Sequence, residues 1–481
     1  MNDSIPLHCR LFALIALLTG TLAPAAAPSA LPSPSLSACT IKDIARPARC
    51  GSIDVPENPS HPNGRQVSLH IVVVPARNGH PLPDPIVELG GGPGEAATEF
   101  AAEGDDEHRV LTEDHDMLFM DQRGTGGSNA LHCNLYSADD PAANIRDMFP
   151  PQRVQRCLQE VSAHADLTQY SSSRFADDLE IVRRALGYGP LNLFALSYGT
   201  RAAQAYARAY PKSVRTMYLG SIVPIDIATP LPFARAAQEA LEHTLDACEA
   251  DAACHAAYPA LRTELAQVTA ALDAGHVQVP LPGSKDSAPL SRGRFGEFVR
   301  SKLYKPDSAA EVPWLIHQAA AGNWSPVGEH IVARAREAYA DESWGLFLAI
   351  TCNEDVAFLR EADIPPQTRG TLIGDYRVRN QQAACSQWPR YKLAKDFRAP
   401  FRTDVPTLIV SGDLDPATPL AFTRHIAPGI SQRFEVILHG QAHSGWSDCV
   451  SGLYNQLVRS GTTRALKDAC DRPEPRPPFK V

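Results

Sequence analysis

Residues 191–199 read LNLFALSYG, an apolar run that ends in a serine between small residues. The first part, Leu191–Leu196, is typical of a buried strand. The alanine-rich stretch that follows, from Thr200 to Tyr210, is typical of a helix that ends before Pro211. We therefore predict a strand, a sharp turn and a helix, with Ser197 exposed at the turn.

Strand-like and helical patterns alternate on both sides of this unit. A helical pattern from Phe175 to Leu186 stops at Gly187, shortly before the central strand. Other strand-like runs lie at residues 67–74, 85–89, 116–120, 216–220, 407–411 and 434–438. Such alternation predicts the α/β class, with a mostly parallel sheet that carries helices on both faces.

One long segment departs from this alternation. Residues 224–400 contain Ala/Leu/Glu-rich helical stretches, such as Ala234–Ala253, and few strand-like runs. The 481-residue chain is long enough for a large core and an added module, because single cores stop growing near about 250–300 residues. We therefore predict an inserted helical cap. The predicted parts are a signal peptide at 1–27, the first part of the core at 28–223, the cap at 224–400 and the C-terminal part of the core at 401–481.

The chain begins with a pattern typical of a secretory signal peptide. Arg10 precedes the apolar run Leu11–Leu22, and small residues follow within 23–27. The run is shorter than the about 20 residues of a transmembrane helix, so no membrane anchor is expected. We predict a secreted or periplasmic protein with a cleavable linker at 24–37 and a loose, proline-rich tail after Arg472.

Ten of the 11 cysteines follow the predicted signal peptide, an even number in an exported chain. They fall into five successive close pairs, which predicts five local disulfide bonds. The pairs are Cys39–Cys50, Cys133–Cys157, Cys248–Cys254, Cys352–Cys385 and Cys449–Cys470. A metal site is not predicted, because CxxC and HExxH motifs are absent.

The charge of the chain argues against nucleic acid as a partner. The formal net charge of −9 arises from 45 basic and 54 acidic residues that are spread along the sequence. No Lys/Arg run is present that could follow a phosphate backbone.

Ser197 is the candidate nucleophile. The predicted turn needs small residues two before and two after the serine, because the flanking backbone comes close to the strand and the helix. Ala195 and Gly199 meet this need, although alanine replaces the usual first glycine. The N-terminus of the following helix also favours developing negative charge.

The candidate acid lies after the strand-like run at 407–411. A serine needs a base to take its proton, the base needs an acid to fix its tautomer, and the expected chain order is Ser, Asp, His. The segment GDLDPATP offers Asp413 and Asp415. We favour Asp415, because Pro416 biases it to extended geometry, whereas Asp413 could cap the turn.

The candidate base lies after the last strand-like run, where HGQAHSG offers His439 and His443. His439 follows the strand directly and is expected to take part in hydrogen bonds at the end of the sheet. His443 lies further out in the loop and is the better base. Their spacing of four could suggest metal ligands on a helix, but Gly440 and the preceding strand-like run argue against a helix.

An oxyanion hole needs backbone N–H donors close to the reacting carbonyl, each worth about 2.7–4 kcal/mol in the transition state. One donor is the residue after the nucleophile, here Tyr198, and the other comes from a loop after an early strand. That loop is GGGPG at Gly90–Gly94. Pro93 has no N–H, so Gly91 and Gly92 are the candidates.

Four segments together resemble a known family, the prolyl aminopeptidase and tripeptidyl aminopeptidase branch of the α/β hydrolases in its secreted bacterial form. They are GGGPG at Gly90, DQRGTGGS at Asp121, the SYG elbow at Ser197, and GDLDPATP with QAHSG near the C-terminus. DQRG with an upstream GGPG is fairly specific to this branch. The resemblance covers most of the mature chain, more weakly in the cap, and implies the α/β-hydrolase fold.

The resemblance implies an exopeptidase that releases one or a few residues from a free N-terminus, with the cap closing over the amine. It supports the triad Ser197, Asp415 and His443, with an oxyanion hole at Gly92 and Tyr198.

The resemblance also implies roles for three further residues. It suggests that Asp121 and Arg123 brace the loop beside the site. Members of the family bind the substrate ammonium through cap carboxylates, and we predict this role for Glu354 in the segment CNED, with a solvated acidic turn as the alternative. Gly90 replaces the His or Pro that is common before GGPG, and Ala195 replaces Gly, so the specificity cannot be inherited.

Three functions are compatible with these residues. The first is an aminopeptidase that acts on short peptides, and the second is a carboxylesterase or lipase that uses the same triad on esters. A binding protein without catalysis would be favoured if a triad residue were missing, and none is. We expect a monomer that acts on a small peptide or ester, with no metal or organic cofactor, because side chains and water complete the chemistry.

Overall fold

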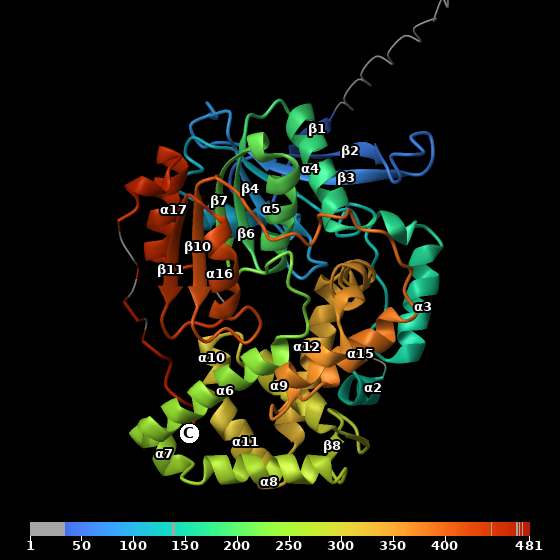
Figure 1. The fold of residues 1–481 in the computed structure, drawn as a ribbon, viewed down its shortest axis with the longest axis vertical. Coiled ribbons are helices and arrows are strands. Elements are labelled where there is room, and N and C mark those ends of the chain that lie inside the picture. The colour runs from blue at the N-terminus through green and yellow to red at the C-terminus, as the bar shows by residue number, and fades with distance from the viewer. Residues whose placement is uncertain (1–33, 137–139, 444, 468–469, 471, 474) are drawn as a thin grey trace, which may run out of the picture. The chain divides into compact units, whose positions relative to one another are not determined.

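The computed structural model describes residues 34–481, apart from 137–139, 444, 468–469, 471 and 474 and the side chains of 338–341 (Figure 1). The predicted signal peptide at 1–27 lies outside the described residues. Within the described ranges, every helix is too short or too polar to span a bilayer.

Nine strands form one sheet in the order β1-β2-β3-β5-β4-β6-β7-β10-β11. Their bounds are β1 Ser35–Cys39, β2 Ala48–Pro56, β3 Gln66–Val74, β4 Ile86–Leu89, β5 Met117–Met120, β6 Leu191–Leu196, β7 Val214–Gly220, β10 Thr407–Gly412 and β11 Arg433–Leu438. Neighbours from β5 to β11 pair in parallel, whereas β1, β2 and β3 pair antiparallel with one another and β3 pairs antiparallel with β5. The predicted mostly parallel sheet is confirmed.

Two of these strands are not predicted by the sequence pattern. β1 begins at Ser35, inside the segment predicted as a linker at 24–37, and it is short and rich in small residues. β2 carries polar residues at exposed positions and Gly51 in its middle, which weakens its apolar pattern. Both become strands through their pairing at the edge of the sheet.

Each face of the sheet carries its own apolar core, because successive side chains of a strand point to opposite faces. Along β10, Leu408 and Val410 pack in the core that contains residues of helix α17 (Asp448–Ser460). Ile409, between them, packs in the other core, with helices α4 (Ser172–Ala185) and α5 (Tyr198–Ala209). Helices therefore cover both faces, as predicted.

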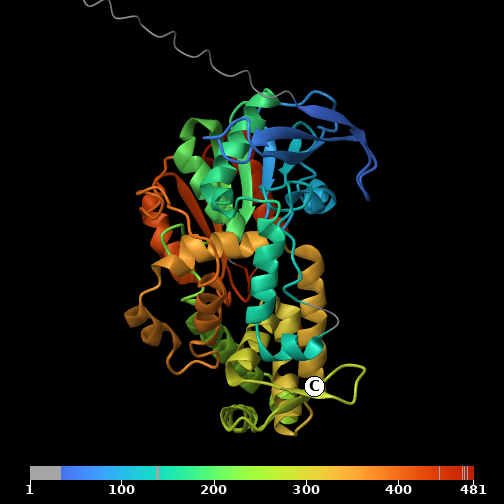
Figure 2. The ribbon, with the colours of Figure 1, turned by 90° about the vertical axis from the view of Figure 1, so that its right-hand side faces the viewer.

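Between β7 and β10 the chain is mainly helical, as the sequence predicts for the cap. The helices are α6 Phe233–Ala250, α7 Ala252–Ala257, α8 Leu261–Asp273, α9 Arg292–Lys302, α10 Pro306–Ala309, α11 Val312–Ala320, α12 Ser325–Asp341, α13 Trp344–Ile350, α14 Ile364–Thr368 and α15 Tyr376–Cys385. A short hairpin, β8 Gln278–Pro280 and β9 Ser287–Pro289, pairs antiparallel. Figures 1 and 2 show most of these helices beyond the carboxyl ends of β10 and β11.

The cap also receives helices from the first part of the chain. Helices α2 (Pro141–Arg146) and α3 (Pro151–Ser162) lie within 28–223, the segment predicted as core. Ile145 of α2 packs in the apolar cluster of α8, α11 and α12. Val161 of α3 packs in a second cluster with residues of α13 and α15. The boundary at 224 therefore does not separate every cap-contacting helix from the core.

The end of the chain is docked, which corrects the prediction of a loose tail after Arg472. Phe479 is buried in the apolar cluster of the cap. The backbone N–H of Lys480 donates to the Ala310 carbonyl at 3.1 Å, and its ammonium lies 3.4 Å from the centroid of the Trp314 ring. The proline-rich composition conceals these contacts, because the apolar anchor is a single residue.

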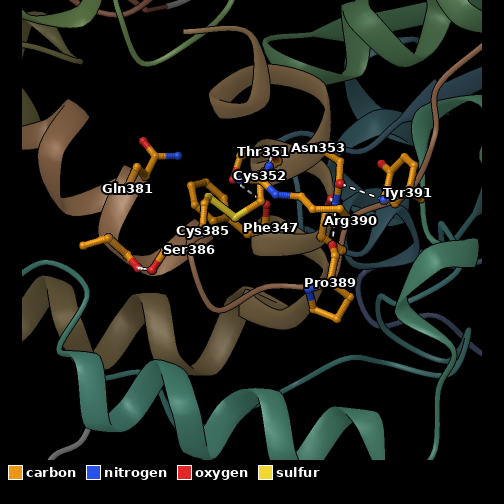
Figure 3. The surroundings of a disulfide bond; sticks show 12 residues. Phe347, Thr351, Cys352, Asn353, Gln381, Cys385, Ser386, Pro389, Arg390 and Tyr391 are labelled. Carbon is orange, nitrogen blue, oxygen red and sulfur yellow. Dashed lines mark hydrogen bonds between the residues drawn. A yellow bond between two sulfur atoms is a disulfide. The ribbon is translucent and has the colours of Figure 1, made fainter. Parts of the chain in front are cut away.

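All five predicted disulfide bonds are present: Cys39–Cys50, Cys133–Cys157, Cys248–Cys254, Cys352–Cys385 and Cys449–Cys470. The Cys352–Cys385 bond joins the π-helical turn η4 (Thr351–Asp355) to the C-terminal residue of α15 (Figure 3). This bond holds together two cap elements that both contribute to the site described next.

Candidate active site

Ser197 lies at a sharp turn between β6 and α5. Its φ is 54° and its ψ is −127°, a conformation that residues other than glycine rarely adopt. A Cβ on Gly199 would lie 2.6 Å from the Leu89 carbonyl oxygen, so only glycine fits at this position. Ala195 is fully buried in β6. The turn has the shape of a nucleophile elbow.

The two candidate aspartates and two candidate histidines form two separate pairs. Asp415 Oδ2 lies 2.8 Å from His443 Nδ1, and Asp413 Oδ2 lies 2.9 Å from His439 Nδ1. The side chains of the first pair are 0 % and 11 % exposed, whereas those of the second are 27 % and 51 % exposed. The buried pair consists of the two residues favoured from the sequence.

Asp415 is held as a carboxylate. The backbone N–H groups of Ala417 and Thr418 both donate to its Oδ1 at 2.8 Å, and the Thr418 hydroxyl donates to Oδ2 at 2.6 Å. Burial alone would raise its pKa, but the charge and hydrogen bond of His443, together with the hydrogen bonds of Thr418, lower it to about 2. Asp415 is therefore ionised at neutral pH and can fix the tautomer of His443.

The loop that carries His443 lies between the elbow and the cap. The His443 N–H donates to the Tyr304 carbonyl at 3.1 Å, and the two rings meet edge to face at 4.8 Å. A Cβ on Gly445 would lie 3.3 Å from Leu196 Cδ1, so the loop also touches the residue before Ser197. Among the described residues, no hydrogen bond joins the Ser197 hydroxyl to His443, a contact that often forms only when substrate is bound.

The candidate oxyanion loop, Gly90–Gly94, follows β4, which pairs in parallel with β6. Gly92 has a φ of 99° and precedes Pro93 through a cis peptide bond. Tyr198 is the first residue of α5, so its N–H has no partner within the helix. Gly92, Pro93, Ser197 and Tyr198 line one pocket, an arrangement that can present backbone donors to a carbonyl at Ser197.

The DQRG segment holds the loops beside this pocket. Asp121 accepts the backbone N–H groups of Thr98 and Gly127, both at 2.9 Å. Arg123 donates twice to Asp178, at 2.6 and 2.8 Å, and both side chains are buried. Between them, the Gln122 amide donates to the Tyr198 hydroxyl at 3.2 Å. Through these contacts Asp121 and Arg123 stabilise the backbone beside the pocket, as the resemblance implies.

The pocket at Ser197 has a volume of about 100 Å³, and its far wall belongs to the cap. The charged residues that line it are Arg201, Arg300, Asp355 and Arg377. The three arginines are not predicted from the sequence, and Asp355 lies in the predicted CNED segment, in which Glu354 is preferred. A charged residue in a helix is most often solvated, and the sequence does not show that these side chains turn toward the core.

Glu354 lies in η4 and is fully buried. Its Oε1 accepts the Ser172 N–H at 2.8 Å and the Tyr391 hydroxyl at 3.3 Å, and its Oε2 accepts the Ser172 hydroxyl at 2.7 Å. Glu354 is absent from the pocket lining, whereas its neighbour Asp355 belongs to it. The role of Glu354 in binding the substrate amine therefore stays a prediction.

Burial raises the pKa of Glu354 to about 7, although the charge of Arg201 and the hydrogen bonds from Ser172 act in the opposite direction. Its proton is therefore exchanged near neutral pH. The Ser172 hydroxyl also lies 2.9 Å from the Tyr198 hydroxyl. Glu354 thus connects through Ser172 to the residue whose N–H is the candidate oxyanion donor.

Comparisons with known protein families agree with this fold. The family described as "alpha/beta hydrolase fold" matches residues 84–284, and the family described as "TAP-like protein" matches residues 370–470. The first match contains the GGGPG loop and the elbow, and the second contains the loops of both Asp–His pairs.

Curated relatives are similar at modest identity. Serine protease Hip1 of Mycobacterium tuberculosis is 26 % identical over 413 residues, which cover 77 % of each chain. Tripeptidyl aminopeptidase of Streptomyces lividans is 27 % identical over 200 residues, or 38 % of this chain and 36 % of its own. A solved structure, proline iminopeptidase of Mycobacterium smegmatis, is 16 % identical with a TM-score of 0.43, over 85 % of this chain and 98 % of its own.

The fold and the matched families define the chain as an α/β hydrolase. The matched families and the names of its relatives support an α/β-hydrolase peptidase family, as its motifs predict.

Proposed function

We propose that this protein is a secreted serine exopeptidase that releases one or a few residues from the N-terminus of peptides. The observation that carries the proposal is the buried Asp415–His443 pair, whose loop lies against an elbow that places Ser197 in a pocket. The relatives named as a serine protease and as aminopeptidases support peptides as the substrate class.

The proposed mechanism follows from these positions. His443 takes the proton of the Ser197 hydroxyl, which attacks the scissile carbonyl, while Asp415 stabilises the imidazolium that forms. The N–H groups of Gly92 and Tyr198 bind the oxyanion. His443 then protonates the leaving amine, and water hydrolyses the acyl-enzyme by the same route in reverse.

Glu354 enters the proposal as the cap carboxylate for the substrate amine. The hydrogen bonds to the Glu354 carboxylate come from Ser172 and Tyr391. A substrate ammonium group that bound this carboxylate would therefore have to displace the Ser172 hydroxyl. Asp355 already lies on the pocket surface. We therefore propose that the amine end of the substrate lies at η4.

Export is part of the proposal. The five disulfide bonds are the supporting observation, because such bonds persist in oxidising compartments. The compartment would be the periplasm or the outside of the cell, and mass spectrometry of the mature protein would locate the cleavage site.

The proposed activity is tested with chromogenic anilides of free and N-blocked amino acids and tripeptides, alongside short-chain nitrophenyl esters. The expected result is release of the anilide from free but not from blocked substrates, and its loss in the folded variant Ser197→Ala. Hydrolysis of esters alone would replace the exopeptidase with a carboxylesterase. Appreciable turnover by Ser197→Ala would refute the triad.

A further inference from the structure

The pocket beside Ser197 carries an excess of positive charge. Its surface contains three guanidinium groups, from Arg201, Arg300 and Arg377, and one carboxylate, from Asp355. None of these residues is more than 8 % exposed. Charges that are shielded from water act on a bound group with little screening by salt.

Arg201 and Asp355 neutralise each other. Nη1 of Arg201 donates to Oδ2 of Asp355 at 2.9 Å, and Oδ1 of Asp355 accepts the backbone N–H of Thr229 at 2.9 Å. Both carboxylate oxygens are thus engaged within the protein. The net positive charge of the pocket therefore comes from the other two arginines, Arg300 and Arg377.

Arg300 and Arg377 share a single carboxylate, that of Glu297. Arg300 donates to its Oε2 from Nε at 3.0 Å and from Nη2 at 2.9 Å, and Arg377 donates from Nη1 at 3.3 Å. Burial alone would raise the pKa of Glu297, but the charges of the two arginines lower it, so Glu297 is ionised. One positive charge at the wall remains uncompensated.

Two donor groups at this wall are unoccupied. Nε of Arg377 donates to Oε1 of Gln381 at 3.0 Å, but Arg377 Nη2 and Gln381 Nε2 have no hydrogen-bond partner among the described residues. Both side chains lie on α15 and line the pocket, and Figure 3 shows Gln381 on the helix that ends at the Cys352–Cys385 bond. The ring of Phe233 lies 5.1 and 5.5 Å from the guanidinium carbons of Arg300 and Arg377.

These features match what an anion-binding site requires. A buried guanidinium group is costly unless it is paired, and a planar fork of N–H groups matches a carboxylate. The pocket volume of about 100 Å³ accommodates a short side chain but not a long acyl chain. The pocket also contains Ser197, so its occupant belongs to the same molecule as the scissile carbonyl.

We propose that the cap pocket selects substrates whose acyl part carries a carboxylate, such as a glutamyl or aspartyl side chain, and that Arg377, supported by Arg300 and Gln381, binds it. The inference rests on the proposed serine hydrolase chemistry and names its substrate class. The proposed preference applies to peptides and to esters, since both place an acyl group at Ser197.

The test compares pairs of substrates of similar size in which one member carries the carboxylate and the other does not. They are p-nitroanilides of Glu and Gln, of Ala-Ala-Glu and Ala-Ala-Gln, and p-nitrophenyl esters of succinate and butyrate. We expect kcat/KM for the acidic member to exceed that for the neutral member about tenfold or more in the series that the enzyme cleaves. Arg377→Gln should remove this preference by lowering kcat/KM for the acidic member about ten- to a hundredfold, with the neutral member changed less than about twofold.

The controls separate charge recognition from a general effect on the cap. Arg377→Lys keeps the charge and should retain part of the preference, and Glu297 keeps both bonds to Arg300 in either variant. Arg379→Gln, on the same helix, removes an exposed arginine that pairs with Asp375 and Glu361 and should leave the ratio unchanged.

The outcomes distinguish this inference from the proposed function. Equal or higher rates for neutral substrates, or a preference that survives Arg377→Gln, would overturn the carboxylate receptor and leave the exopeptidase intact. If the enzyme cleaves only esters and prefers the succinyl ester, the exopeptidase activity is overturned and the carboxylate-binding pocket is supported.

Discussion

Asp413 and Asp415 stand two residues apart in one loop, yet each holds a different histidine. The two aspartates differ in burial and in the number of hydrogen bonds that their carboxylates accept. Asp415 receives two backbone N–H groups and a hydroxyl in addition to His443. Asp413 is more exposed and accepts the Gly440 N–H besides His439. Of these two pairs, the buried one has the fixed geometry that the proposed general base requires.

This duplication provides a matched pair of variants. Asp415→Asn should lower kcat on the order of 10³–10⁴-fold, because the amide no longer fixes the tautomer of His443 or stabilises its charged form. Asp413→Asn should change kcat less than about threefold. Steady-state kinetics on the same substrate measures both, and equal losses would contradict the assignment. Because the pKa of Asp415 is about 2, its titration should not contribute to the pH–rate profile above about pH 4.

Glu354 gives a prediction for stability. The pKa of its carboxyl is raised by burial to about 7 in the folded protein, against an ordinary value of 4.5. The folded state therefore holds this proton more tightly than the unfolded chain. The resulting stabilisation is fully present below about pH 4.5 and is lost as the pH rises through about 7, with a total of about 3 kcal/mol.

Glu354→Gln should remove this contribution to the pH dependence. Urea unfolding at pH 5 and pH 8 should show a larger decrease in the free energy of unfolding for the native chain than for the variant. Glu361→Gln, at an exposed carboxylate, is the control. An identical pH dependence in the native chain and Glu354→Gln would show that the buried carboxyl titrates as in the unfolded chain.

At the residue scale, the sequence predicted what local chemistry requires. Ser197 is predicted from the small residues at 195 and 199, and Asp415 and His443 from the strands before them; the structure pairs the last two. Arg300 and Arg377 could not be identified from the sequence. Arg300 lies three residues after Glu297 on α9, but its burial is not visible in the sequence, and Arg377 reaches Glu297 from α15, a helix distant in sequence.

At the element scale, the strands of the sheet centre were predictable because buried parallel strands are continuous apolar runs. β6 has the bounds that the sequence predicts, Leu191–Leu196. The edge strands β1 and β2 are defined by pairing and were missed. Helices α2 and α3 were not assigned to the cap, because the clusters that bury Ile145 and Val161 are formed by residues far along the chain.

The Cys352–Cys385 bond should matter to the pocket more than the other bonds do. It joins η4, which carries Asp355, to α15, which carries Arg377 and Gln381. Its sequence separation of 33 residues corresponds to about 3–4 kcal/mol in the chain-entropy model. Replacing both cysteines with serine should lower the unfolding free energy by about this amount and raise KM.

The double variant of Cys248 and Cys254, whose bond lies away from the pocket lining, is the control. It should lower stability with KM unchanged. Thermal unfolding and steady-state kinetics of both variants provide the measurement. A change of KM in the control alone would mean that the bond at η4 does not shape the pocket.

At the scale of the whole described molecule, the chain after β10 returns to the core and then ends on the cap. Cys470 is tied to Cys449 of α17, and the residues that follow lead to Phe479 and Lys480 at the cap. The cap is thus connected to the core at the two ends of the inserted segment and, in addition, by this C-terminal segment. Composition alone could not predict this, because a proline-rich segment gives no signal for its docking site.

Phe479→Ala tests the third connection. Phe479 is 9 % exposed and packs in the apolar cluster of the cap, so its loss should cost about 1–3 kcal/mol of unfolding free energy. Because Lys480 donates its backbone N–H to Ala310, hydrogen exchange should also become faster around α10 and α11. Val481→Ala, at a residue that is 67 % exposed, is the control and should change neither quantity. If Phe479→Ala leaves stability and exchange unaltered, the tail is a passive segment that does not stabilise the cap.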